Sequence, residues 1–414
     1  MNMIIEITGL FIFLHPAVMA VYWSIAGIIY FVFMENKRKG ILLGKMPAEN
    51  IPLVSIMMPC YNEADQLEES IPHLLTLQYP NYELILINDG SSDKTGEIID
   101  RWAQKNKRIT ALHQKNSGKA SALNNALNLA KGKYVLCIDG DAVLDYSALD
   151  YMVMALEKNP VYAAVTGNPR VRNRSTILGC LQVSEFSAII GLIKRAQSLI
   201  GTIFTVSGVC CLFNAEIIRR LGGWSTDMLT EDLDISWKLQ TAGYNIYYEP
   251  RAICWVLMPE RLGGLFKQRL RWAQGGAEVI IKYFPQVWRF KNRRLWPMYI
   301  EYLVTANWVF LLLLSTIASF YGIITGHNML HLFETSLLKP GIILLFFTFL
   351  LQFLCSLYID SKYENGLFRY AFHCIWYPWA YWLIGMATLA IGLPRAIFRK
   401  KSQFAVWTSP DRGV

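Results

Sequence analysis

The sequence predicts an α/β domain with a mixed, mainly parallel sheet that is inserted between transmembrane α-helices. Two observations support this prediction. Of the 414 residues, 53% are hydrophobic and only 17% are charged, whereas a soluble domain usually carries about 25% charge. In the central part of the chain, short apolar runs alternate with helical patterns, which is typical of a parallel sheet covered by helices on both faces.

Four stretches are apolar and long enough to cross a bilayer, which takes about 20 residues. They lie at about residues 7–34, 299–325, 340–359 and 371–394. Basic residues follow the first stretch, whereas a signal peptide has its charges in front, so we expect a retained anchor. Arginines and lysines also precede the second stretch. The positive-inside rule therefore places the intervening segment, about 35–298, in the cytoplasm.

The C-terminal part gives conflicting signals about topology. Three spans after a cytoplasmic domain would put the C-terminus outside, yet Arg395, Arg399, Lys400 and Lys401 follow the last stretch. Either one apolar stretch does not cross, or the late charges are overruled. Pro378 and its aromatic neighbours make the last stretch the weakest candidate.

Composition and charge limit the class of protein further. We expect an N-terminal membrane anchor (1–34), a cytoplasmic domain (35–260), interfacial amphipathic helices (261–298), a C-terminal membrane region (299–394) and a basic tail (395–414). The net charge of +9 suits an anionic membrane surface, a phosphate-bearing substrate or nucleic acid. The eight cysteines include no C-x-x-C pair, so buried reduced thiols are a simpler reading than a disulfide framework or a zinc ribbon.

The cytoplasmic segment begins with five apolar runs separated by helical patterns. The runs lie at 54–59, 83–88, 110–113, 134–138 and 163–166, and the helical patterns at 63–77, 94–106, 121–130 and 147–158. In such sheets ligands bind beyond the carboxyl ends of the strands, so the residues after each run are site candidates.

The first two runs are followed by P-C-Y-N-E at 59–63 and N-D-G-S-S-D at 88–93. Asp89 stands at the strand tip, where it can accept a hydrogen bond from a ligand. Asp93 can cap the next helix, which is the simpler interpretation for that residue. After the third run, Lys119 opens a helix, and a helix N-terminus with a lysine suits a phosphate. The motif is not a Walker loop, and a solvated first-turn lysine alone explains it better.

The strongest local signal is D-G-D at 139–141, directly after a buried run. Carboxylates two residues apart on extended chain point to the same side. Asp139 and Asp141 would repel one another without a cation. Mg²⁺ commonly takes one or two carboxylates together with substrate phosphates. The alternative is a polar turn after a strand.

Two more motifs lie downstream. T-E-D at 230–232 has the form of a helix start with a capping residue, and acids in a first turn also suit the helix dipole. In Q-R-L-R-W at 268–272, Gln268, Arg271 and Trp272 fall within about one helical turn. A guanidinium there can hold a phosphate, and an indole can stack on a sugar or a lipid. An interfacial amphipathic helix before a span would show the same pattern.

The order of these motifs is more specific than any one of them. P-x-Y-N-E, D-G-S, G-K, D-x-D, T-E-D and Q-x-x-R-W, in this order, resemble the processive membrane glycosyltransferases of the inverting GT-A type, which include cellulose, chitin and hyaluronan synthases. The resemblance covers the segment 35–298 and its flanking spans. Length, layout and the tail at 407–413 are most similar to the poly-β-1,6-N-acetylglucosamine synthases of the intercellular-adhesion type from biofilm-forming bacteria.

The resemblance implies a role for each motif residue. Tyr61, Glu63 and Asp89 would bind the uridine, Lys119 and Asp139 the nucleotide, and Asp141 the Mg²⁺ or Mn²⁺ ion. Asp232 would be the general base, with Glu231 beside it in the catalytic motif. Gln268, Arg271 and Trp272 would border the acceptor and the diphosphate. Asn88 stands where several relatives have an aspartate, so the uridine contact would rest on Asp89.

The same resemblance implies a multi-pass enzyme of a bacterial cell membrane with a cytoplasmic GT-A domain. It would transfer N-acetylglucosamine from UDP-N-acetylglucosamine to a growing β-linked polysaccharide, with β-1,6 linkage, and help to export it for biofilm formation. A chitin- or hyaluronan-like synthase, a transferase of one sugar to a lipid carrier, or a non-enzymatic scaffold are the alternatives. Four spans are few for a polar glycan path, so we expect a small transmembrane accessory subunit. No nucleic-acid partner is expected.

Overall fold

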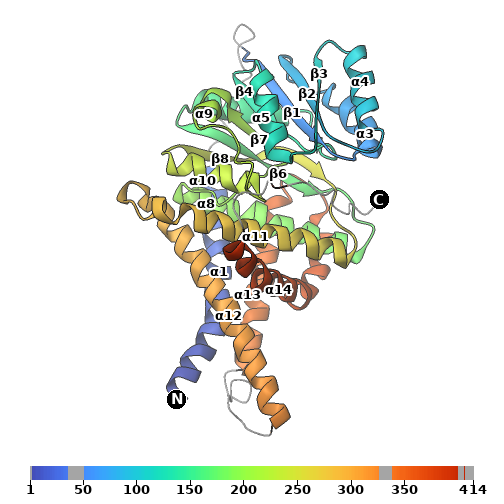
Figure 1. The fold of residues 1–414 in the computed structure, drawn as a ribbon. Helices are drawn as coiled ribbons and strands as arrows, with labels where there is room; N and C mark the ends of the chain where they lie inside the picture. The colour runs from blue at the N-terminus through green and yellow to red at the C-terminus, as the bar shows by residue number, and fades with distance from the viewer. Residues whose placement is uncertain (1, 36–50, 326–337, 400–404, 406–414) are drawn as a thin grey trace.

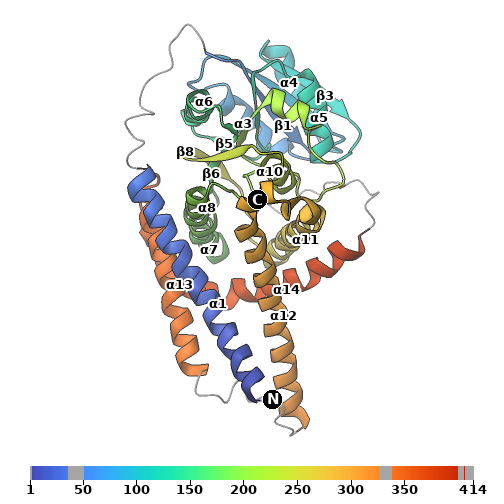
Figure 2. The ribbon, with the colours of Figure 1, turned by 90° about the vertical axis from the view of Figure 1, so that its left-hand side faces the viewer.

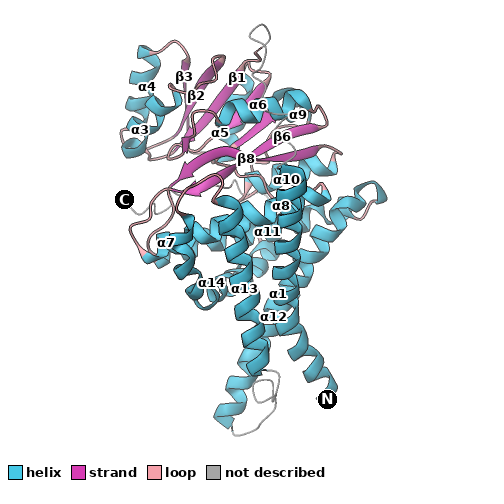
Figure 3. Cartoon of the chain, turned by 180° about the vertical axis from the view of Figure 1, so that it is seen from behind, coloured by secondary structure: helices cyan, strands magenta, loops and turns pink. Residues whose placement is uncertain are grey.

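The computed structural model describes residues 2–35, 51–325, 338–399 and 405. Strands and their covering helices form one end of the molecule, and long helices extend away from it (Figure 1). The helical half contains no strand in the part of the chain that is described, as the view from behind makes clear (Figure 3). The predicted basic residues after the anchor (37–45) and the tail motif (407–413) lie outside the described residues.

Eight strands of the described chain form one sheet in the order β3-β2-β1-β4-β7-β6-β8-β5. The strands are β1 (Val54–Cys60), β2 (Tyr82–Asp89), β3 (Ile109–Gln114), β4 (Tyr134–Cys137), β5 (Val143–Leu144), β6 (Tyr162–Val171), β7 (Cys211–Asn214) and β8 (Asn245–Val256). β1 to β4 pair in parallel, as do β6 and β8, whereas β7 runs antiparallel to β4 and β6 and β5 antiparallel to β8. The prediction of a mixed, mainly parallel sheet is therefore confirmed.

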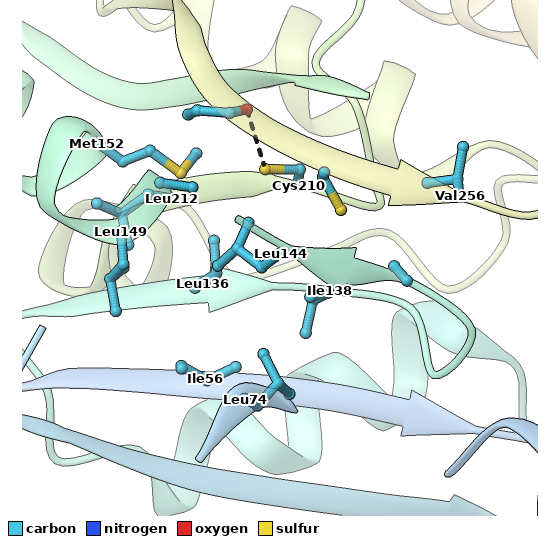
Figure 4. Packing of buried hydrophobic residues seen from close by; sticks show 14 of the residues in the cluster. Ile56, Leu74, Leu136, Ile138, Leu144, Leu149, Met152, Cys210, Leu212 and Val256 are labelled. Carbon is cyan, nitrogen blue, oxygen red and sulfur yellow. Dashed lines mark hydrogen bonds between the residues drawn. The ribbon is translucent and has the colours of Figure 1, made fainter. Parts of the chain in front are cut away.

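Helices cover both faces of this sheet. They are α3 (Ala64–Leu74), α4 (Thr95–Lys105), α5 (Lys119–Leu129), α6 (Ala148–Lys158), α9 (Ala215–Arg220) and α10 (Glu231–Thr241). All seven residues of β1 are buried, as expected for a central strand covered on both sides. Ile56, Leu136 and Leu212, from adjoining strands, pack against Leu149 and Met152 of α6 (Figure 4).

The remaining helices lie on the other side of the molecule. They are α1 (Asn2–Ile29) with its π-helical end η1 (Tyr30–Glu35), α7 (Ile177–Phe186), η3 (Ser187–Ile193), α8 (Lys194–Ile200), α11 (Leu262–Val287), η4 (Phe290–Leu295), α12 (Trp296–Thr325), α13 (Leu338–Asp360), η5 (Leu367–Trp376) and α14 (Tyr377–Phe398). Of these, α1, α12 and α13 extend together away from the sheet, with the N-terminus at the far end (Figures 1 and 2).

Within the described residues, four helices are long and apolar enough to cross a membrane: Glu6–Glu35, Ile177–Ile200, Phe290–Gly322 and Pro340–Asp360. Three coincide with predicted spans, but Ile177–Ile200 was not predicted. In its most apolar window 72% of the residues are buried inside the protein, against 28% to 33% in the other three. Ile177–Ile200 is therefore covered by the protein itself, and α7 and α8 lie directly below the sheet (Figure 2).

The predicted last span, 371–394, has a different form in the structure. The chain is a 3₁₀ helix up to Trp376, and α14 then begins with Pro378 in its first turn, a position that proline favours. α14 crosses the direction of α12 (Figure 2) and packs against α11. The two helices approach closely at Gly392 of α14, where an added Cβ would lie 2.8 Å from the backbone nitrogen of Gln274 in α11. The contact with α11 therefore sets the direction of α14.

Buried ion pairs fasten the long helices to the sheet. Arg195 of α8 contacts Glu35 at 2.7 Å and Asp360, at the end of α13, at 2.8 Å. Arg170 of β6 contacts the other oxygen of Asp360 at 2.9 Å. The Arg195 and Asp360 side chains are fully buried. Since losing one partner strands a buried charge, these contacts fix the ends of α1 and α13 relative to β6.

Candidate active site

The D-x-D turn lies at the carboxyl end of β4, at the edge where ligands bind in such sheets. Its central residue, Gly140, lies directly against the carboxylate of Glu63, and a Cβ at this position would clash with it. Glu63 is fully buried, and Asp141 is 8% exposed. Glu63 of the first motif therefore packs against the D-x-D turn, and a side chain at position 140 would displace the Glu63 carboxylate.

Lys119 joins three of the sequence motifs. Its Nζ lies 2.5 Å from Asp139 and 3.1 Å from Glu231, and it donates to the Gly208 carbonyl at 3.4 Å. Its side chain is only 14% exposed, so it is not a solvated surface lysine. Burial alone would lower its pKa, but Asp139 and Glu231 outweigh burial and raise the pKa above the ordinary value. Lys119 is therefore a cation at all relevant pH values.

The T-E-D motif starts α10, as predicted. Thr230 is the N-cap residue, but its side chain makes no capping hydrogen bond, so that part of the capping prediction is wrong. The reason is packing, because the Thr230 side chain is wedged against Gly275 of α11, where a Cβ would clash with it. Asp232 instead accepts hydrogen bonds from the backbone N–H of Leu233 at 2.8 Å and of Gly208 at 3.3 Å.

The two acids of this motif have opposite pKa shifts. Burial raises the pKa of Asp232 to about 6, and the charge of Glu231 adds to this effect. Burial also acts to raise the pKa of Glu231, but the charges of Lys119 and Arg271 hold it below its ordinary value. Neighbouring carboxylates with separated pKa values are typical of acid–base sites. Asp232 is thus the carboxylate suited to take up a proton near neutral pH.

Asp89 has a structural environment of its own. It is fully buried and accepts hydrogen bonds from the Gln114 side chain at 2.7 Å and from the backbone N–H of Ser117 and Gly118 at 2.9 and 3.0 Å. These bonds shape the loop that leads into α5 and so position Lys119. Tyr61 is half-buried and directly follows β1, the strand next to β2.

Asp93 binds the starts of two helices, although the N-cap residue of α4 is Lys94 and not Asp93. Its two carboxylate oxygens accept from the backbone N–H of Thr95 at 3.0 Å and of Ala64 at 3.1 Å, so it serves both α4 and α3. These contacts favour the charged carboxylate and lower its pKa, although burial acts in the opposite direction.

The Q-x-x-R-W residues lie on α11. Arg271 is exposed, but its charge lowers the pKa of both Glu231 and Asp232. Arg271 therefore faces these two acids, which with Asp139 are called the acid cluster below. Trp272 is 37% exposed and stacks on the guanidinium of Arg269 at 4.3 Å. Gln268 is half-buried, and its Oε1 has no hydrogen-bond partner within the described chain. The structure therefore brings Arg271 to the cluster, whereas Trp272 extends the site along α11.

The sequence motifs did not predict a role for the segment around Gly208, which supports Asp232. The N–H of Gly208 donates to Asp232, and the carbonyl of Gly208 accepts from Lys119. Lys194 fixes this segment by donating hydrogen bonds to the hydroxyls of Ser207 at 2.6 Å and Thr166 at 3.2 Å. A lysine within the apolar run 177–200 is the signal that could have drawn attention to it.

The arrangement is compatible with a divalent ion bound jointly with a substrate. Among the described residues, no group of three or more His, Cys, Asp or Glu side chains could hold a metal by itself. Asp141 offers a hard carboxylate ligand at the mouth of the sheet, and Mg²⁺ takes its remaining ligands from water and phosphate oxygens.

Comparisons with known proteins agree with this geometry. The family model described as "Glycosyltransferase like family 2" matches residues 52–275. A poly-beta-1,6-N-acetyl-D-glucosamine synthase of Staphylococcus epidermidis is 41% identical over 410 residues, which cover 97% of this chain and 98% of the relative. The synthase of the same name from Staphylococcus aureus is 41% identical over 406 residues, with 97% and 98% coverage.

Among solved structures, a mannosyltransferase of Pyrobaculum calidifontis in complex with GDP-Man and Mn²⁺ has a TM-score of 0.64 and 21% sequence identity. It covers 93% of this chain and 98% of its own chain. The likeness supports the fold alone. Together, the comparisons confirm the resemblance drawn from the order of the motifs and the expected GT-A fold.

Proposed function

The chain belongs to family 2 of the glycosyltransferases, and from this premise we propose that it is a poly-β-1,6-N-acetylglucosamine synthase. Its sugar donor is UDP-N-acetylglucosamine, and its product is a biofilm polysaccharide. The observation that carries the proposal is the identity of 41% across nearly the whole chain to synthases of that name. The contacts among Lys119, Asp139 and Glu231 support it, because they join three sequence motifs in one site.

The reaction needs one protein carboxylate as a base. Asp232 takes the proton of the acceptor hydroxyl while that oxygen attacks the anomeric carbon and the bond to the diphosphate breaks. With a pKa of about 6, Asp232 is mostly ionised at neutral pH and ready to accept a proton. Direct displacement at an α-linked donor gives the β-linked product. Arg271 faces the cluster and neutralises charge on the leaving diphosphate.

Binding of the donor falls to the strand-end residues. Tyr61, Glu63 and Asp89 border the uridine, and Lys119 and Asp139 the nucleotide. Asp141 would hold a Mg²⁺ or Mn²⁺ ion, and such an ion would stabilise the charge that develops on the diphosphate. Gln268 and Trp272 border the acceptor, because an exposed indole offers a face on which a sugar ring stacks.

The membrane arrangement that we propose has three crossing helices, α1, α12 and α13. α14 packs against α11 and lies at the membrane surface, on the side of the catalytic domain (Figure 2). The C-terminus and Arg399 are then cytoplasmic, and Arg399 contacts Glu278 of α11 at 2.6 Å. This arrangement removes the conflict between the number of spans and the basic tail.

A polar glycan needs a polar path through the bilayer, because an unpaired hydroxyl in hydrocarbon is costly. Three crossing helices, with only about a third or less of their most apolar windows buried, leave much surface for a neighbour. A small transmembrane accessory subunit therefore packs against them and completes the path.

The product of the full chain tests the proposal. Membranes or nanodiscs that contain the chain are incubated with radiolabelled UDP-N-acetylglucosamine, and the product is sized on a gel, with Asp232→Asn as the control. We expect a long polymer from the wild type only. A single sugar on a lipid would indicate a non-processive transferase, and incorporation from another nucleotide sugar would refute the donor assignment.

A further inference from the structure

A second site lies apart from the acid cluster. A cavity of about 370 Å³ opens between the C-terminal parts of α10 and α11 and the segment leading into α12. Besides the hydroxyl residues Thr241 and Tyr283, its polar lining contains six side chains: Lys238, Lys282, Gln286, Arg289, Lys291 and Asn292. Four of these six side chains are cationic, and they come from three different elements.

Three of these four cations form no ion pair within the described chain. Lys282 contacts Asp234 at 2.6 Å. Lys238 donates to the Gly223 carbonyl at 2.6 Å, a neutral partner. Arg289 and Lys291 have no ion-pair partner among the described residues. Burial and the like charge of Lys282 lower the pKa of Lys238, although Asp234 and Asp227 act in the opposite direction. The cavity thus suits an anion.

The lining also offers an acceptor. The Oε1 atom of Gln286 is buried and has no hydrogen-bond partner in the described structure. A buried acceptor without a donor costs free energy, so a ligand that brings a hydroxyl group would be favoured. Asn292 is tied to the carbonyl of Gln286 at 2.8 Å and keeps this corner in shape. A phosphate with a hydroxylated substituent matches both features.

The surroundings indicate where such a phosphate comes from. Phe284, Trp288 and Phe290 are 53%, 41% and 71% exposed, and they belong to the same segment as the lining. The candidate span Phe290–Gly322 starts here, at the corner between α11 and α12 (Figure 1). Exposed aromatic rings beside cations at the start of a span are typical of the level of lipid headgroups. A cavity at that level faces phospholipid.

We propose that this cavity binds the headgroup of an anionic phospholipid with a hydroxylated substituent, such as phosphatidylglycerol. Lys238, Arg289 and Lys291 contact the phosphate, and Gln286 accepts from the headgroup hydroxyl. Lys238 distinguishes this site from an ordinary basic flank, because it comes from α10 rather than from the segment next to the span. The inference rests on the proposed membrane placement, but not on the identity of the polymer.

Lipid retention by the purified full chain tests the proposal. Native mass spectrometry measures bound lipid while phosphatidylglycerol or phosphatidylcholine is titrated into the detergent solution. Lys238→Gln and Lys291→Gln should each weaken phosphatidylglycerol binding about fivefold, the contribution of one interfacial cation. The control is Arg293→Gln, because this residue belongs to the same basic segment, lies over the Phe290 ring at 4.6 Å and is outside the lining. It should retain the lipid as the wild type does.

Each other outcome overturns the proposal. An equal loss in Arg293→Gln would reduce the site to a general basic flank. Equal binding of phosphatidylcholine would exclude recognition of an anion. If millimolar glycerol phosphate displaced bound phosphatidylglycerol and stayed bound when more lipid was added, the cavity would be assigned to a soluble phosphate. Lys291 is exposed, so its variant should unfold at the wild-type temperature, and loss of lipid by that variant cannot be attributed to misfolding.

Discussion

Glu231 offers the sharpest test of the acid–base assignment. Its charge raises the pKa of Asp232, whereas Lys119 and Arg271 lower it. Glu231→Gln removes a negative neighbour, so the pKa of Asp232 should fall and the base should stay ionised at lower pH. Lys119→Met removes a positive neighbour and should move the pKa upward. The two variants therefore shift the acidic limb of the pH–rate profile in opposite directions.

The size of the shift follows from the charges. Two unit charges on the order of 8 Å apart interact by about 2 kcal/mol at an effective dielectric constant of about 20, or about 1.5 pKa units. A wild-type base with a pKa of about 6 loses about fourfold in rate between pH 7.5 and 5.5. Glu231→Gln should lose almost nothing over the same range.

The assay is the pH dependence of kcat/KM, measured by release of UDP, because this quantity reports the pKa values of the free enzyme. The fold of each variant is checked at both pH values by its unfolding temperature. If the acidic limb stayed at the same pH in both variants, or moved to higher pH in Glu231→Gln, Asp232 would not be the titrating base.

Three further predictions concern the metal, the base and the buried ion pairs. Asp141→Asn should abolish turnover in a folded, membrane-inserted chain, and EDTA should stop the wild type until Mg²⁺ or Mn²⁺ is added. Asp232→Asn should lower the rate about a hundredfold or more, with donor affinity measured by calorimetry unchanged. Asp360→Asn leaves the buried Arg170 and Arg195 without their common counter-charge. This substitution should lower the free energy of unfolding by about 3 to 5 kcal/mol, which is measured as a lower unfolding temperature.

The controls for these predictions are specific. Full activity in EDTA would remove the metal from the mechanism. Lost donor affinity with a retained rate would make Asp232 a donor-binding residue. Glu216→Gln breaks an exposed pair with Arg220 and should leave the unfolding temperature unchanged, as surface pairs contribute little. If Asp360→Asn behaves in the same way, the buried pairs do not fasten the long helices.

The sequence predicted the first half of the sheet well because each strand there is a short apolar run between a helix and a polar turn. It did not predict β8, in which Pro250 interrupts the run. In the structure the pairing of β6 and β8 shifts register at this place, and Asn168 donates to the Pro250 carbonyl at 2.9 Å. The buried Asn168 side chain, from a strand that is distant in the sequence, thus accommodates the proline. Local sequence patterns cannot predict such a contact.

The site followed the same division. Motif order singled out Lys119, Asp139 and Glu231 as candidates, because each follows a strand or starts a helix. It could not foresee that Lys119 joins the other two, since the three come from α5, the end of β4 and α10. Nor could it place α14, whose direction depends on a close helix contact at Gly392 rather than on its own hydropathy.

The linkage of the product tests the central claim most directly. The full chain, reconstituted with its membrane lipids and given UDP-N-acetylglucosamine labelled with ¹³C, yields material whose anomeric configuration and linkage are read by two-dimensional NMR. The account predicts a polymer of β-linked N-acetylglucosamine joined through the 6-position, absent from the Asp232→Asn preparation. A polymer with another linkage, or a single labelled sugar on a lipid, would contradict it.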